Sequence, residues 1–149
     1  MPKVNKITVP SDLRVAERCR LVADWANKEV DRCIWTEKVL IGKGYAGRCD
    51  GLLLMKDGTQ AVIDFKNRKV NPKYGVNAYE SDVAQLSAYS ECIEGKPRAI
   101  SIIVASNEPA VLQTKDWEKD EMQASFEAFK SLLKVWAWTK DYTPPGMEL

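Results

Sequence analysis

Residues 52–66 read Leu-Leu-Leu-Met-Lys-Asp-Gly-Thr-Gln-Ala-Val-Ile-Asp-Phe-Lys, and this stretch decides the fold that we expect. Two apolar runs joined by Asp57-Gly58 are typical of an antiparallel hairpin with a tight turn. Side chains alternate along a strand, so Asp64 and Lys66 should share one face of the sheet with Val62. The hairpin therefore places a carboxylate and an ammonium group together on one face.

A second carboxylate, that of Asp50, lies on the first arm of the same hairpin. Because the arms run antiparallel, Asp50 and Asp64 should be cross-strand neighbours, and two like charges about 5 Å apart are unfavourable unless a cation offsets them. Two aspartates offer the oxygen ligands that Mg²⁺ or Mn²⁺ prefers, and Lys66 can orient or polarise an attacking water or steady the phosphate. The alternative is that Asp64 and Lys66 form the solvated face of an edge strand.

The flanking sequence predicts an α/β sandwich built on one mixed sheet, because a meander of strands is followed by a helix and an apolar central strand. Ser11 and the Asn77-Glu80 pair are the expected helix N-terminal signals. In order, we expect a helix from 11 to about 32, strands over 34–41, 45–56 and 60–67, a helix from 77 to about 94, a strand over 99–105 and a helix over 117–138.

The first and last helices carry apolar stripes at 3.6-residue spacing, which should face the core. Trp136 belongs to such a stripe, so we expect it to pack in the core rather than to stack on bases with Trp138. The tail over 143–146 should be frayed. The stripe residues are Val15, Cys19, Val22, Ala26 and Val30 in the first helix, and Met122, Phe126, Phe129, Leu133 and Trp136 in the last.

Length and composition indicate a single domain of an ordinary globular protein. The 149 residues are 45% apolar and 29% charged, and the net charge of +1 gives no general basic excess for nucleic acid. No apolar stretch reaches the roughly 18 residues of a membrane helix and the N-terminus lacks an apolar signal core, so we expect an intracellular protein without membrane contact. The lack of histidine excludes Ser-His and Cys-His catalysis, and the four scattered cysteines should be reduced and mostly buried.

Gln85 and Tyr89 lie four residues apart on the expected second helix and therefore share one face. One interpretation is an exposed polar face with an incidental tyrosine. The other is a pair of hydrogen-bonding side chains directed back at the two aspartates and at a bound phosphate.

Three motifs in this order resemble those of the PD-(D/E)xK nuclease superfamily, and they are most similar to its RecB-type and phage-type exonuclease branch. They are the GxxD of residues 47–50, the DxK of residues 64–66 and the QxxxY of residues 85–89. The resemblance covers about residues 11–106. It implies a restriction-endonuclease-like core in αβββαβ order, here with an extra C-terminal helix.

The same resemblance implies roles for the motif residues. Asp50 and Asp64 would bind the metal and Lys66 would be the catalytic lysine. Gln85 and Tyr89 would support the site and contact the substrate strand.

Members of the superfamily usually add a glutamate, or in the RecB branch a histidine, upstream of the sheet. This chain has no histidine, and the grouped iron–sulfur cysteines of some RecB-type nucleases are also missing. Glu17 resembles the early-helix glutamate of archaeal Holliday-junction resolvases and is the favoured third metal ligand. Helical periodicity places Glu17 opposite the apolar stripe, so Glu29, at the edge of the stripe, and Glu37, on the first strand, are the alternatives.

The resemblance implies a Mg²⁺- or Mn²⁺-dependent deoxyribonuclease, first an exonuclease acting on DNA ends or single strands and second a junction or flap endonuclease. A noncatalytic nucleic-acid-binding module of the same fold is the alternative from another functional class. The compact size suggests a phage or mobile-element enzyme. The basic residues expected near the DNA backbone are Arg48, Arg68, Lys69 and Lys73.

Overall fold

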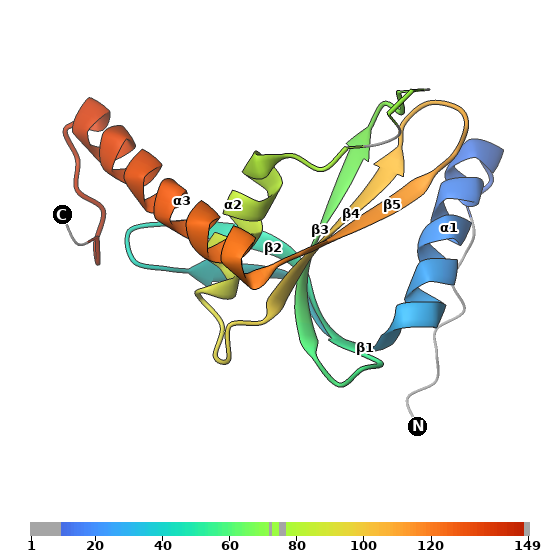
Figure 1. The fold of residues 1–149 in the computed structure, drawn as a ribbon, viewed down its shortest axis with the longest axis horizontal. Helices are drawn as coiled ribbons and strands as arrows, with labels where there is room; N and C mark the ends of the chain where they lie inside the picture. Colours follow the sequence, from blue (N-terminus) through green and yellow to red (C-terminus); the bar gives the residue numbers. More distant parts are fainter. Residues whose placement is uncertain (1–9, 72, 75–76, 148–149) are drawn as a thin grey trace.

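The computed structural model describes residues 10–71, 73–74 and 77–147, which form a mixed five-stranded sheet flanked by helices (Figure 1). The order confirms the expected αβββαβ arrangement with an additional C-terminal helix. In chain order the elements are α1 (Leu13–Glu29), β1 (Val30–Ile41), β2 (Ala46–Met55), β3 (Gln60–Arg68), α2 (Glu80–Ser90), β4 (Arg98–Ala105), β5 (Leu112–Trp117) and α3 (Lys119–Lys140).

The strands lie in the sheet in their sequence order. β1, β2 and β3 form the expected antiparallel meander, β4 runs parallel to β3, and β5 pairs antiparallel with β4. The parallel pair requires a crossover, which α2 provides. Among the described residues, no helix is both long and apolar enough to cross a membrane.

Each face of the sheet has its own apolar core, as the alternation along β3 predicts. Val62 belongs to the core on the α2 side, where it clusters with Leu86 and Tyr89 of that helix. Ala61 and Ile63 belong to the core on the other side, against which α1 packs. Figure 1 shows α1 beside the β4–β5 edge of the sheet, away from α2 and α3.

Both predicted N-terminal signals are displaced by one or two residues. Asp12, rather than Ser11, caps α1 and accepts a hydrogen bond from the backbone N–H of Arg14 at 2.9 Å. Tyr79, rather than Asn77, precedes α2, and the Asp82 carboxylate accepts from its N–H at 2.9 Å. Asp12 lies two residues before the N–H that it accepts from, and Asp82 lies three residues after, so an aspartate side chain satisfies a backbone N–H at the start of each helix.

The predicted apolar stripe of α1 is wrong in its first half. Val15 and Cys19 are exposed, whereas Ala16 is buried and Trp25 packs against the sheet. The reason lies in Arg18, which is mostly buried and donates to backbone carbonyls of the β4–β5 connection. These hydrogen bonds fix the rotation of the helix about its axis. They stabilise the fold more than burial of the Val15 side chain would.

β5 was not among the expected elements. The first and last helices also begin and end at residues other than those predicted. Residues 112–117 carry few apolar side chains because β5 is an edge strand whose outer positions face solvent. Its presence moves the start of α3 to Lys119. α1 ends at Glu29 because the chain enters β1 directly, and α2 ends at Ser90.

The end of α3 differs from expectation. Trp136 is 45% exposed and meets the ring of Tyr142 edge-on, so the prediction of core packing is wrong. Figure 1 shows the reason, since the last turns of α3 extend beyond the sheet and have no layer beneath them. The tail is not frayed over its described part, because Pro144 is buried and Met147 lies against Gly44.

All four cysteines are free, as expected. Cys49 is buried and Cys92 is half-buried, but Cys19 and Cys33 are exposed, contrary to the prediction that most would be buried.

Candidate active site

β2 and β3 separate at the point where the two predicted carboxylates lie. Their ladder pairs Leu52 with Val62 and ends at Gly51 with Ile63, so Asp50 and Asp64 are the next residues on the two arms. Asp50 continues the contact with its side chain instead of its backbone. Its Oδ2 accepts a hydrogen bond from the backbone N–H of Phe65 at 2.7 Å. The open end of the hairpin thus carries both acids.

A local irregularity in β2 directs this separation. Cys49 and Leu52 both belong to the core on the α2 side, although three residues apart, so the strand changes face between them. Glu37 of β1 lies between the pairs that match Thr36 with Gly51 and Lys38 with Cys49, and it has a left-handed φ of 51°. A non-glycine residue in this region is strained, and such strain is commonly found at functional sites.

The DxK and QxxxY motifs are joined by a continuous chain of polar contacts. The ammonium group of Lys66 lies 2.7 Å from Asp64 Oδ2 and donates to Gln85 Oε1 at 3.0 Å. Gln85 Nε2 donates to the Tyr89 hydroxyl at 3.2 Å, and that hydroxyl donates to the backbone carbonyl of Arg48 at 3.1 Å.

This chain has a single direction. An ammonium group can only donate, so the Gln85 side chain must present its oxygen to Lys66 and its nitrogen to Tyr89. The Tyr89 hydroxyl proton is then directed at a carbonyl that can only accept. The contacts of Gln85 and Tyr89 thus hold Lys66 in place, and a direct contact of either residue with a substrate strand stays a prediction.

Asp64 is held in an environment that opposes its negative charge. Burial raises the pKa of Asp64 above its ordinary value, the carboxylates of Asp50 and Asp82 raise it further, and Lys66 only partly offsets these effects. Asp64 Oδ2 contacts Lys66 as an ion pair but has no hydrogen-bond partner among the described residues. A buried oxygen of this kind fits a divalent cation, which would relieve the repulsion between the carboxylates.

Cys49 lies beside the two aspartates but is an unsuitable ligand or nucleophile. Burial raises the pKa of its thiol to about 11, and the charges of Asp50 and Asp64 contribute. The thiol donates weakly to the carbonyls of Gly51 and Ile63. It therefore stays protonated at neutral pH and acts as packing.

The structure does not bring a third acidic residue to Asp50 and Asp64. Within the described ranges, no group of three or more Asp, Glu or Cys side chains is arranged to hold a metal ion. Glu17 is exposed on α1, and Glu29 ends that helix beside Lys28. Glu37 is nearest in register, yet its carboxylate pairs with Arg48 Nε at 2.8 Å.

The four predicted DNA-contacting cations differ in their surroundings. Arg68 makes a bidentate pair with the buried carboxylate of Asp82, with both N–O distances at 2.6 Å, and Tyr79 stacks on its guanidinium group. This internal pairing gives Arg68 a structural contact, and its contact with DNA stays a prediction. Arg48, Lys69 and Lys73 are exposed.

The sequence reasoning assigned no role to two residues of the site. Asp82 anchors α2 to β3 through Arg68, and its position one turn before Gln85 was the available signal. Gly47 lies where an added Cβ would approach the Tyr89 hydroxyl to 2.7 Å. A glycine within a strand often marks such a close approach, so the GxxD motif has a packing reason for its glycine.

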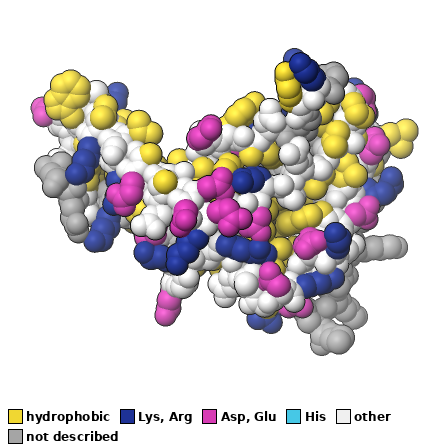
Figure 2. All heavy atoms as spheres, in the orientation of Figure 1, with side chains coloured by type: hydrophobic (Ala, Val, Ile, Leu, Met, Phe, Trp, Pro, Cys, Tyr) yellow, Lys and Arg dark blue, Asp and Glu magenta, His cyan; other side chains and the backbone are white. Residues whose placement is uncertain are grey.

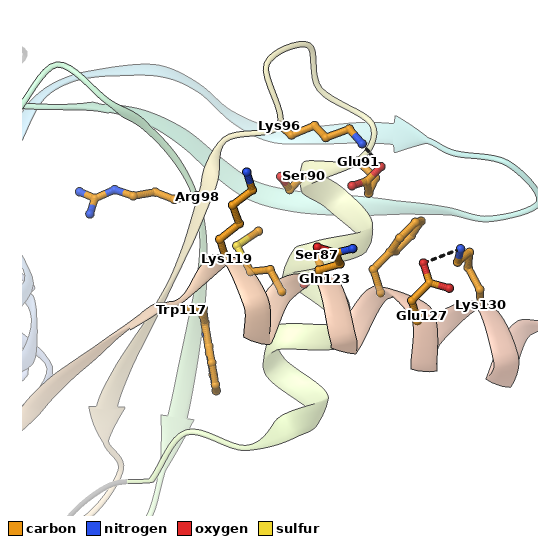
Figure 3. Close-up of a pocket in the computed structure, with 12 residues that line it drawn as sticks. Ser87, Ser90, Glu91, Lys96, Arg98, Trp117, Lys119, Gln123, Glu127 and Lys130 are labelled. Atoms are coloured by element: carbon orange, nitrogen blue, oxygen red, sulfur yellow. Dashed lines mark ion pairs between the residues drawn. The ribbon is translucent and has the colours of Figure 1, made fainter.

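A cavity of about 640 Å³ lies elsewhere, in a groove between α2 and α3. Figure 3 shows Ser87 and Gln123 at its centre with Lys96 and Lys119 above them. It is on the opposite flank of α2 from Gln85 and Tyr89, so it is separate from the two aspartates.

Comparisons with known proteins support the fold. The chain is similar to the "Putative exonuclease" of Eubacterium rectale, with a TM-score of 0.60 and 10% identity over 89% of this chain and 57% of that one. It therefore spans a little over half of that neighbour. SSO0001 is another match, at 13% identity over 83% of this chain and 62% of that one, with a TM-score of 0.39. No protein-family model and no curated protein matches. The chain has an α/β, restriction-endonuclease-like fold.

Proposed function

We propose that this protein is a divalent-metal-dependent deoxyribonuclease that hydrolyses phosphodiester bonds. The main support is the chain of polar contacts from Asp64 through Lys66 and Gln85 to Tyr89. It lies next to Asp50, where β2 and β3 separate. A solvated edge-strand face would leave Asp64 exposed, yet it is 5% exposed and its charge is opposed by burial.

Asp50 and Asp64 are the residues that would hold Mg²⁺ or Mn²⁺. The bound ion would supply a water of lowered pKa and stabilise negative charge on the phosphate. Lys66 is held at the same carboxylate and can position that water or the scissile phosphate. Its orientation is fixed before substrate arrives, because Gln85 and Tyr89 already hold it.

Action on DNA ends or single strands is the preferred form of this activity. The QxxxY resemblance favours it, and the fold neighbour described as an exonuclease agrees. The third ligand position would be filled by water or by Glu37, which would first have to leave Arg48.

The test is cleavage of labelled single-stranded and blunt-ended DNA with Mg²⁺ or Mn²⁺ by the wild type and two variants. Asp64→Asn and Lys66→Ala should each reduce the rate by at least about 100-fold. Glu17→Gln should behave as wild type if that exposed residue is not a ligand. Cleavage that persists in Asp64→Asn and Lys66→Ala would contradict the proposal, and binding without cleavage by the wild type would favour the noncatalytic module.

A further inference from the structure

We propose that the flank of α3 is a binding groove for single-stranded DNA, distinct from the metal site. This inference rests on the proposed function, since it assigns an additional contact to the same substrate. The groove, called the α3 groove below, is defined by five lysines that line two cavities: Lys43, Lys96, Lys119, Lys130 and Lys134. Trp138 does not line either cavity, but it lies one helical turn beyond Lys134 on α3 and continues the same flank.

Two cavities join to form this groove. The first, of about 640 Å³, lies between α2 and the first half of α3, and the second, of about 330 Å³, lies between the second half of α3 and the β1–β2 turn. Glu127 and Lys130 line both cavities, so the two meet at this ion pair. Figure 3 shows the pair at one end of the first cavity.

The charge of the groove differs from that of the whole chain. The chain has a net charge of only +1, yet the five lysines of the α3 groove face two lining glutamates, Glu91 and Glu127. Lys96 and Lys130 pair with these glutamates at 2.9 and 2.8 Å, but the lysines are 67% and 46% exposed. Exposed pairs of this kind contribute little, so phosphates can replace the glutamates. Arg98 also lines the first cavity, but its guanidinium group pairs with Asp57 and Asp116.

The side chains follow the helix in a regular stripe. Lys130, Lys134 and Trp138 are four residues apart, and so lie on one flank with about 6 Å between successive positions. Trp138 is 81% exposed, the highest value among the aromatic residues of α3. Figure 2 shows hydrophobic side chains at the free end of α3, and basic side chains interspersed with acidic ones along the rest of the helix.

The floor of the groove can accept bases. Phe126 is half-buried there, and the buried hydroxyl of Ser87 has no hydrogen-bond partner among the described residues. An unpartnered buried hydroxyl indicates that a ligand or water completes it. Lysines that follow a phosphate backbone and aromatic rings that stack on bases are the usual components of sites for single strands. A protein partner explains Trp138 but not the row of lysines.

The experiment measures fluorescence anisotropy of labelled oligothymidylates of about 4 to 20 nucleotides, the range of single-strand site sizes. The protein carries Asp64→Asn and is kept free of divalent metal, so the probe is not cut. Trp138→Ala should weaken binding of the longer strands about 5- to 100-fold. The double variant Lys130→Ala/Lys134→Ala should also reduce the slope of log affinity against log salt by about 1.4.

Two matched controls separate the groove from general effects. Lys28→Ala removes a positive charge from the exposed face of α1, and Leu132→Ala truncates another exposed apolar residue on a different side of α3. Both should bind as the Asp64→Asn parent does. Unchanged affinity in the groove variants, or an equal loss in Lys28→Ala, would overturn the proposal. So would a change in sedimentation on Trp138→Ala and Leu132→Ala with oligonucleotide affinity intact, which would indicate a protein interface.

The outcome is independent of the nuclease assay. If the wild type cuts no DNA but the groove variants lose binding, the proposed nuclease function is wrong and the DNA-binding role of the α3 groove is supported. If the wild type cuts DNA and the groove variants bind as the parent does, the α3 groove fails and the nuclease stands.

Discussion

The hydroxyl of Tyr89 donates to the backbone carbonyl of Arg48 at 3.1 Å, and this bond attaches α2 to β2 only two residues before Asp50. Through Gln85, the same hydroxyl also fixes the ammonium group of Lys66 on β3. One tyrosine therefore sets the spacing between the strands that carry the two acids. The QxxxY motif thus connects β2 to β3 through side-chain hydrogen bonds at the open end of the hairpin.

Removal of that hydroxyl should lower turnover more than binding. In Tyr89→Phe, Gln85 loses the partner that fixes its amide, so Lys66 is held less well and kcat should fall about 10- to 100-fold with little change in KM. Tyr45→Phe is the matched control, because the Tyr45 hydroxyl also donates to a backbone carbonyl of the same region, that of Ala88, at 2.8 Å. Steady-state kinetics should show kcat unchanged in the control, and equal losses in both variants would contradict this role of Tyr89.

Divalent metal should stabilise the folded protein through the two aspartates. With free Mn²⁺ at about 100 times its dissociation constant, the free energy of unfolding should rise by about 2.7 kcal/mol. For a chain of this size the melting temperature should then rise by about 5 to 10 °C. Thermal unfolding of Asp50→Asn and Asp64→Asn should show no such rise, whereas Asp116→Asn, outside the site, should respond as wild type.

The stability difference between Asp64→Asn and the wild type should depend on pH in metal-free solution. The pKa of Asp64 is raised in the folded state, first by burial, so the carboxylate costs free energy once it ionises there. Stability from the protonated group is present below its unfolded pKa and is lost as pH rises through the folded pKa. Urea unfolding from about pH 4 to 7 should show Asp64→Asn gaining on the wild type, and a constant difference would contradict the assignment.

The Arg68–Asp82 pair should be a major stabilising contact. Burial is the largest single effect and would raise the pKa of Asp82. The hydrogen bonds from Arg68 and from the backbone N–H of Tyr79, together with the charges of Arg68 and Lys66, outweigh it, so the pKa is lowered. Its contribution is therefore present above the unfolded pKa and lost as pH falls through the folded pKa, below about pH 4. Asp82→Ala should lower the free energy of unfolding by about 3 kcal/mol at neutral pH.

A more exposed ion pair provides the comparison for Asp82. Asp116 pairs with Arg98, and both side chains are about one-third to one-half exposed. Asp116→Ala should therefore cost less than about 1 kcal/mol in the same urea experiment. Equal costs for the two variants would contradict the view that burial gives the Arg68–Asp82 pair its strength.

The hairpin at the centre of the fold could be predicted because its signals are local. The Asp57-Gly58 turn and the alternation along β3 determine which residues share a face, so the position of Asp64 and Lys66 followed directly. The separation of β2 from β3 at Asp50 could not be predicted. It depends on a change of face within β2 and on the strained backbone of Glu37 on the neighbouring strand.

Other features depended on tertiary contacts that no local pattern encodes. The rotation of α1 follows from the bonds of Arg18 to a loop nearly ninety residues away. β5 has too few apolar side chains to be distinguished from a loop. The exposure of Trp136 arises because α3 is longer than the layer beneath it, although its stripe continues without interruption.

Every member of the polar chain, together with both acids, lies between Arg48 and Tyr89. The proposed active site is thus contained in a single ββα segment, while α1, β5 and α3 are contributed by the sequence on either side. A mutation or insertion in these outer elements would leave the contacts among Asp64, Lys66, Gln85 and Tyr89 in place. If the proposed function holds, the outer elements are therefore the part of the chain where sequence changes would alter substrate preference and not the metal site.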